Sequence, residues 1–122
     1  MEKEIILNDV QREFYNKVIN TPIEELDLSP KVFIAFLQTN FFTIYDFMDK
    51  PNDYLLNIRG FNFEEIKEVE DRLKAKYYFF KLGMTSEELK SVIFNMPLDE
   101  VMSELDQDKH GKGKQYTLGN LK

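Results

Sequence analysis

One stretch of the 122 residues, LLNIRGFNFEEIKEVEDRL (residues 55–73), constrains the fold of this chain most strongly. Gly60 follows an apolar run that ends near Ile58, and glycine readily takes the backbone conformations of a tight turn. Asn62 and Glu65 have the spacing of a capping box, in which each side chain accepts a backbone N–H at the start of a helix. The stretch therefore predicts two short helices joined by a tight glycine turn.

Apolar residues at helical spacing recur along the rest of the sequence, and no segment alternates as a half-buried strand would. Residues 8–19 are predicted to form an amphipathic N-terminal helix. Pro30 suits the first position of a second helix, with Ser29 as its cap. Thr43 and Pro51 each stand where a further short helix is expected to begin.

Two more helices are predicted after the hairpin. Thr85 and Glu88 form a second capping box, and Pro97 ends or kinks the helix that they open. A last apolar stripe reaches residue 105, whereas residues 106–122 are polar and glycine-spaced, which predicts a flexible basic tail. The predicted fold is all-α: a compact bundle of short helices containing a helix-hairpin-helix, with extra N- and C-terminal helices.

Composition fits one globular domain without a membrane segment. With 43% hydrophobic residues and only 5 Gly and 4 Pro, the sequence is able to bury a core. It has no run of about 18 apolar residues and no basic-then-apolar leader. It has no cysteine, which excludes disulfides and thiolate chemistry. The cytoplasm is the expected compartment.

The charge balance disfavours a generic polyanion as partner. The sequence holds 16 Lys and Arg against 22 Asp and Glu, a net charge of −6. Residues 1–105 alone hold 12 basic and 20 acidic side chains, or −8. Such a surface repels a phosphate backbone unless its cations gather on one face. Any binding of DNA is therefore expected to be weak or very local.

The sequence predicts no enzyme. It contains no phosphate loop, no nucleophile elbow and no paired acid and base, and its one histidine, His110, lies in the polar tail. Two carboxylate clusters lack the histidine or cysteine of a metal site, so we interpret them as solvated helix faces; they are Glu24, Glu25 and Asp27, and Glu64, Glu65 and Glu68. We expect no metal, no cofactor and no small-molecule substrate.

Four short segments carry a resemblance to a known family. They are IEELDLS, LLNIRGF, EIKEV and LGM, in this order between Pro22 and Met84. This region resembles the C-terminal domain of the bacterial RNA polymerase alpha subunit. The resemblance implies a compact bundle of four short helices that contains a helix-hairpin-helix. It divides the molecule into an arm (1–21), the family-like domain (22–84), added helices (85–105) and the tail (106–122).

In that family, the domain binds the minor groove of A/T-rich upstream promoter DNA and docks activators and sigma factor. Lys31 falls on the position of the family's groove-entering arginine, and Ile34 replaces an asparagine that helps to hold DNA. Where the family's hairpin carries lysines, this chain has Phe63, Glu64 and Glu65. The resemblance therefore implies the family's fold with a less cationic DNA-facing corner.

Two sets of candidate residues follow from the resemblance. Residues that retain a capacity for DNA are Lys31, Arg59, Gly60 and Lys67. Residues expected to meet a protein partner are Phe63, Glu64 and Glu65.

Three functions remain open at this point. The first is a transcription-associated module that binds a protein, which could be a regulator, a sigma factor, polymerase or a second copy of the chain. The second is a weak minor-groove DNA-binding module. The third is a structural component that keeps only an ancestral resemblance. The sequence also leaves open whether the terminal helices pack within one chain or between two.

Overall fold

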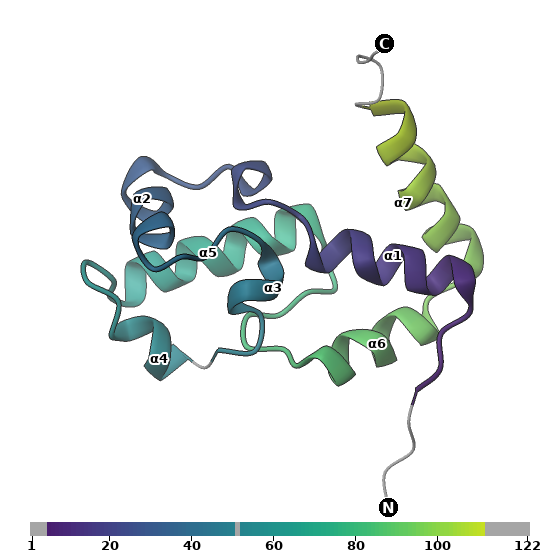
Figure 1. Cartoon of the computed structure of the whole chain (residues 1–122), viewed down its shortest axis with the longest axis horizontal. Helices are drawn as coiled ribbons and strands as arrows, with labels where there is room; N and C mark the ends of the chain where they lie inside the picture. The colour runs from purple at the N-terminus through teal and green to yellow at the C-terminus, as the bar shows by residue number, and fades with distance from the viewer. Residues whose placement is uncertain (1–4, 51, 112–122) are drawn as a thin grey trace, which may run out of the picture.

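The computed structural model describes residues 5–50 and 52–111, with side chains in 5–50 and 53–106. These parts of the chain are all-α, as predicted, and contain no strand (Figure 1). The elements are α1 (Asp9–Ile19), a 3-10 turn η1 (Ile23–Leu26), α2 (Pro30–Gln38), α3 (Ile44–Phe47), α4 (Asn52–Leu56), α5 (Phe63–Lys76), α6 (Ser86–Asn95) and α7 (Leu98–Gly111). The helix start predicted at Pro51 lies outside the described residues.

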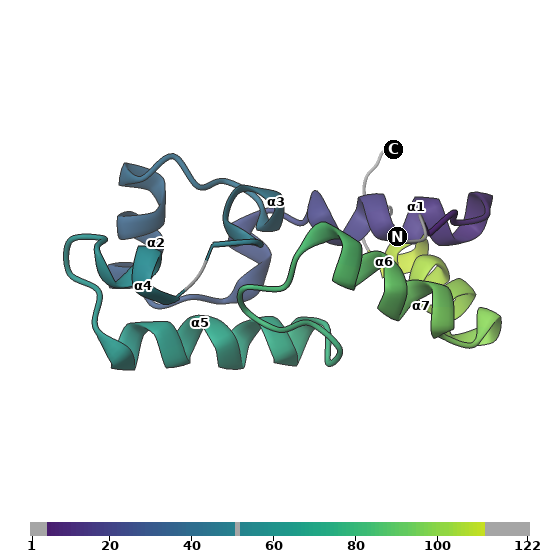
Figure 2. The same cartoon turned by 90° about the horizontal axis from the view of Figure 1, so that it is seen from below.

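The helices gather at two ends of an elongated body (Figures 1 and 2). Helices α2, α3 and α4 cover one side of α5, the longest helix of this half. Helices α1, α6 and α7 lie together at the other end, and both α6 and α7 contact α1. The terminal helices therefore pack within one chain. None of the described helices is long and apolar enough to span a bilayer.

The two predicted capping boxes are confirmed. Asn62 N donates to Glu65 Oε1 at 2.9 Å, and the Asn62 side chain accepts from the first turn of α5. Thr85 N donates to Glu88 Oε1 at 2.8 Å, and Glu88 N donates back to Thr85 Oγ1 at 3.1 Å. Each box satisfies backbone N–H groups that a helix start leaves without an intrahelical partner.

An aromatic cluster holds the hairpin against α2. The fully buried Phe36 packs its ring against Phe41, Phe47 and Phe61, with centroids 5.5, 4.9 and 5.6 Å away. Phe61 follows the glycine turn directly, so its stacking on Phe36 fixes the turn over α2. These rings form the core of the half that carries the hairpin.

A second aromatic group joins α1 to the same core. Phe14 is fully buried and meets Tyr77 and Phe79 edge-on, at centroid distances of 6.4 and 5.9 Å. The buried Tyr77 hydroxyl shares a hydrogen bond of 2.7 Å with Thr21 Oγ1. Since these contacts link α1 to the segment after α5, the core continues from one end of the molecule to the other.

Helix α7 continues beyond the apolar stripe from which it was predicted. The sequence placed its end at residue 105, but the helix runs to Gly111. Residues 106–110 contain neither proline nor glycine, so nothing in them stops a helix that has already begun. Residues 112–122 of the predicted tail, and the side chain of His110, lie outside the described residues.

Candidate functional site

The hairpin corner is formed by residues 30–34 at the start of α2 and residues 58–67 around the turn and the start of α5. Gly60 has φ +88°, a left-handed conformation that glycine adopts without strain. A Cβ atom built on Gly60 would lie 3.9 Å from Lys31 Cε, which is an ordinary contact. The turn therefore needs glycine for its backbone angle, and it lies directly against the Lys31 side chain.

In the structure, a residue predicted to contact DNA forms an ion pair with a residue predicted to contact a protein partner. Lys31 Nζ donates to Glu65 Oε2 at 2.8 Å, although 34 residues separate them. The Glu65 side chain is 11% exposed and that of Lys31 is 59% exposed. Lys31, predicted to contact DNA, is thus paired with Glu65, which was predicted to contact a protein partner.

The same contacts shift both pKa values. The hydrogen bond from Lys31, followed by that from the Asn62 backbone, lowers the pKa of Glu65 below its ordinary value of 4.5. The bond to Glu65 and its charge raise the pKa of Lys31 above 10.5. Both groups therefore remain charged at neutral pH, and their charges cancel at the centre of the corner.

Glu68 has a structural role that the sequence did not reveal. Its carboxylate accepts from Ser29 N at 2.6 Å and from Ser29 Oγ at 3.0 Å. Ser29 occupies the N-cap position of α2, as predicted, but its side chain makes no capping bond within α2 and donates to Glu68 on α5 instead. The interpretation of Glu65 and Glu68 as parts of a solvated face was wrong, because Glu65 is buried and Glu68 is half-buried. No local pattern reveals a contact between residues 39 positions apart.

The remaining candidate cations are exposed. Lys67 Nζ lies 3.4 Å from Asp71 Oδ1, one helical turn further along α5, and both side chains are largely exposed. Arg59 is exposed beside the glycine turn, and its side chain has no ion-pair partner among the described residues. Among the side chains predicted to contact DNA, Arg59 is thus the one that forms no ion pair with a carboxylate in the described part of the molecule.

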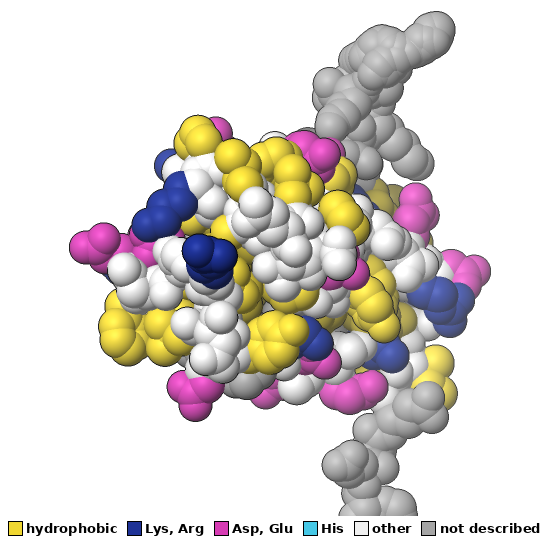
Figure 3. Space-filling view, turned by 60° about the vertical axis from the view of Figure 1, so that its left-hand side comes forward, with side chains coloured by type: hydrophobic (Ala, Val, Ile, Leu, Met, Phe, Trp, Pro, Cys, Tyr) yellow, Lys and Arg dark blue, Asp and Glu magenta, His cyan; other side chains and the backbone are white. Residues whose placement is uncertain are grey.

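Apolar side chains are exposed at the same corner. Phe63, the first residue of α5, is 74% exposed, and Ile34, one turn beyond Lys31 on α2, is 52% exposed. Glu64 is exposed next to Phe63. Figure 3 turns this end of the molecule forward and shows hydrophobic side chains beside both basic and acidic ones. The corner is therefore mixed in character: Lys31 and Lys67 are paired with carboxylates, and among the described residues Arg59 alone of the three candidate cations has no ion pair.

An open groove of about 810 Å³ lies beside the corner, between the η1–α2 connection and α5. It is lined by Asp27, Leu28, Ser29, Pro30, Glu64, Lys67, Glu68, Asp71 and Arg72. Its carboxylates outnumber its cations, so it does not attract phosphate. Within the described part of the chain, no group of three His, Cys, Asp or Glu side chains is arranged to hold a metal ion.

Comparison with known proteins identifies relatives of this fold. The chain is similar to the DNA-directed RNA polymerase subunit alpha of Roseiflexus sp. strain RS-1, with 26% identity over 76 residues, 62% of this chain and 24% of that protein. It is also 29% identical to the same subunit of Chlorobium limicola over 89 residues, 73% of this chain and 27% of that protein. It thus spans about a quarter of the length of the curated relatives it matches.

No solved structure gives a significant match. The family model that describes the C-terminal domain of the bacterial RNA polymerase alpha subunit matches residues 11–75, which include most of α1 and nearly all of α5. This match begins earlier than the resemblance in the sequence, which was placed at residues 22–84, and it covers more than half of the molecule. The chain therefore belongs to the family of the C-terminal domain of the bacterial RNA polymerase alpha subunit.

Proposed function

We propose that this chain is a non-enzymatic, transcription-associated interaction module that binds a protein partner through its hairpin corner. Membership of the polymerase alpha C-terminal domain family supports the link to transcription. The curated relatives are polymerase alpha subunits, and the matched part is a small domain of each. A regulator, a sigma factor, polymerase itself or a second copy of the chain would suit this role.

The hydrogen bond between Lys31 and Glu65 carries the proposal. To meet a phosphate, Lys31 would have to leave the Glu65 carboxylate, which is 11% exposed. Glu65 would then stand near the phosphate without its main counter-charge, and the exposed Glu64 would add to the repulsion. The corner is therefore better suited to a protein surface than to a phosphate backbone.

The side chains available to a protein partner are Phe63, Glu64 and Ile34. An exposed aromatic ring beside a carboxylate is suited to the centre of a docking contact, where aromatic residues contribute most. Glu65 was predicted among the partner-binding residues, but its bonds to Lys31 and Asn62 give it a role in shaping the corner. The proposed contact is therefore centred on Phe63 and Glu64.

Binding of the purified protein to RNA polymerase holoenzyme, and to isolated sigma factor, tests this proposal. Phe63→Ala should weaken binding by about 2 kcal/mol, or roughly 30-fold in Kd, as expected for an aromatic residue at the centre of an interface. Glu64→Lys should weaken it further. Tyr45→Ala is the matched control, since Tyr45 lies on α3 and is 59% exposed. Equal effects of Phe63→Ala and Tyr45→Ala would contradict the proposal.

Weak minor-groove binding is the second candidate, and the exposed Arg59 beside the Gly60 turn favours it. A titration with A/T-rich duplex at low salt, followed residue by residue by NMR, separates the two functions. DNA binding predicts an affinity that falls steeply with salt and drops in both Arg59→Ala and Lys31→Ala. Binding to neither duplex nor any transcription component would favour a structural role that retains only ancestry.

A further inference from the structure

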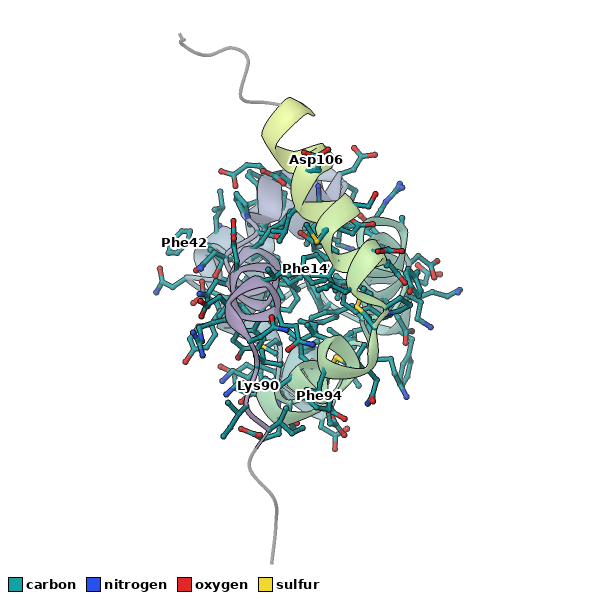
Figure 4. The ribbon with its side chains drawn as sticks, turned by 90° about the vertical axis from the view of Figure 1, so that its right-hand side faces the viewer. Phe14, Phe42, Lys90, Phe94 and Asp106 are labelled. Atoms are coloured by element: carbon teal, nitrogen blue, oxygen red, sulfur yellow. The ribbon has the colours of Figure 1, made fainter. Side chains whose placement is uncertain are left out.

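The end of the molecule opposite the hairpin corner carries a groove between α1 and α7. Figure 4 views this end and shows Phe14 between the two helices and Asp106 further along α7. Buried Val101 and the fully buried Phe14 hold α7 against α1, and Lys17 Nζ donates to the Glu104 carbonyl oxygen at 2.9 Å. Since α7 is fixed to α1 in this way, the groove beside their contact has defined walls.

The groove is partly apolar. Its volume is about 590 Å³, and Val10, Met102 and Leu105 contribute its apolar surface. Met102 is 52% exposed, although it lies on a helix whose neighbouring Val101 is fully buried. Leu98, one turn before Met102, is 49% exposed as well. Helix α7 therefore presents a second apolar stripe that no described element covers.

The charged residues that line this groove are all acidic among the described side chains. They are Glu13, Asp99 and Asp106, and no described lysine or arginine lines the groove. Glu13 and Asp99 have no ion-pair partner among the described residues. Lys17, the nearby cation of α1, is engaged with the Glu104 backbone. A segment with both lysines and apolar side chains would complement this groove.

We infer that residues 112–122 of this same chain bind the groove between α1 and α7. This segment has that composition: it carries Lys112, Lys114 and Lys122 and no acidic residue. Its apolar side chains are Tyr116, Leu118 and Leu121. These lysines would complement the carboxylates of Glu13 and Asp99, and the three large apolar side chains would suit the apolar surface around Met102.

The position of the segment permits this contact within one molecule. Lys112 directly follows the last residue of α7, Gly111, and Asp99 lies twelve residues earlier on the same helix. That is about 18 Å along the helix axis. Eleven residues in extended conformation span up to ~36 Å, so the segment can double back along α7. The tether also gives the segment an effective concentration near the millimolar range, so weak contacts suffice.

A second copy of this face is a poorer occupant. A symmetric dimer through the groove would place its carboxylates against those of the partner, and each copy already has a net charge of −6. If two copies exchanged residues 112–122, each segment would make the same charged and apolar contacts in the groove of the other copy. The test must therefore separate binding within one molecule from exchange between two.

A nitroxide spin label provides the test, because the protein has no cysteine of its own. Thr117→Cys in the whole chain is labelled, because the inference gives Thr117 no contact, and the backbone amide signals of Val10 and Glu13 are followed by NMR at low ionic strength. These two residues lie on α1, so the covalent connection alone does not bring the label close to them. The inference predicts strong loss of their signal intensity, recovered on reduction of the label. Unchanged intensities would overturn it.

Three further measurements test the binding site and whether the contact forms within one molecule or between two. The double variant Glu13→Lys, Asp99→Lys should restore the signals, since it replaces two carboxylates by cations; persistence of the effect would overturn the inference. Met102→Ser should weaken the broadening of the Val10 and Glu13 signals, whereas Phe94→Ser should not, although both side chains are 52% exposed.

A mixture of spin-labelled protein with unlabelled, isotope-enriched protein should show no broadening of these signals. Broadening there would assign the contact to exchange between copies and overturn binding within one molecule.

Discussion

The hairpin corner and the groove between α1 and α7 use similar acidic residues in different ways. At the corner and directly beside it, Glu65 and Glu68 are hydrogen-bonded to residues on α2 or just before it, 34 and 39 positions away in the sequence. In the groove, Glu13 and Asp99 have no such ion pair among the described residues. The comparison teaches that a count of carboxylates predicts little about function until the partner of each one is known.

The largest expected effect tests whether the two ends form one core. Phe14→Ala in α1 and Phe36→Ala in α2 each empty a fully buried aromatic site, at a cost of about 3–5 kcal/mol. Because Phe14 packs on Tyr77 and Phe79, we expect both variants to lower the urea midpoint of a single transition. A separate early transition in Phe14→Ala alone would show that α1 and the C-terminal helices unfold independently of the hairpin half.

The two capping boxes allow the two ends of the molecule to be compared through a smaller loss of stability. Asn62→Ala at the start of α5 and Thr85→Ala at the start of α6 each remove a cap and should each cost about 1 kcal/mol. Chemical denaturation followed by circular dichroism measures both. If α6 frays without affecting the rest, Thr85→Ala will leave the global stability unchanged while amide exchange in α6 accelerates, and the two ends are then unequal.

These caps also show what the sequence could predict. The boxes at Asn62 and Thr85 are local, since the two residues of each box are three positions apart, and they follow directly from the hydrogen-bonding needs of a helix start. The all-α fold and the hairpin could be predicted for the same reason, because both rest on short-range patterns.

The chemistry at the corner could not be predicted in this way. The partners of Ser29 and Lys31 are Glu68 and Glu65 on another helix, and only the packing of the hairpin against α2 brings them together. A lysine and a glutamate 34 positions apart look the same in the sequence whether they pair or face solvent. The end of α7 at Gly111 was missed because residues 106–111 continue no apolar stripe, although residues 106–110 contain no glycine or proline that would end the helix.

The pH dependence of Glu65 should be smaller than the effect of a cap, because its partner Lys31 is mostly solvent-exposed and the pair is screened. The pKa of Glu65 is lower in the folded protein than its ordinary 4.5. Its contribution is therefore complete above about pH 4.5 and is lost as the pH falls through the lower, folded-state value. Glutamine keeps the capping bond but not the charge, so the stability gap between wild type and Glu65→Gln should narrow on acidification.

Unfolding free energies of both proteins between about pH 3 and about pH 7, a range that includes the titration of carboxylates, measure this gap. Glu64→Gln is the control, since Glu64 is exposed on the same turn of α5. A gap that stays constant with pH would show that the Lys31 contact does not favour the charged carboxylate. The ion pair between Lys31 and Glu65 would then be weaker than proposed, and Lys31 would be more available to bind phosphate.

The smallest effect concerns Lys67, whose pair with Asp71 is exposed to solvent on both sides. Lys67→Ala should change the unfolding free energy by no more than about 0.5 kcal/mol. The same variant sharpens the contrast between protein docking and DNA binding, with Lys74→Ala as a control that removes an equal charge from the far end of α5. If the corner docks a protein, both variants should affect duplex binding equally little. A salt dependence that falls by about one unit in Lys67→Ala alone would place a phosphate at this position and favour the DNA-binding function instead.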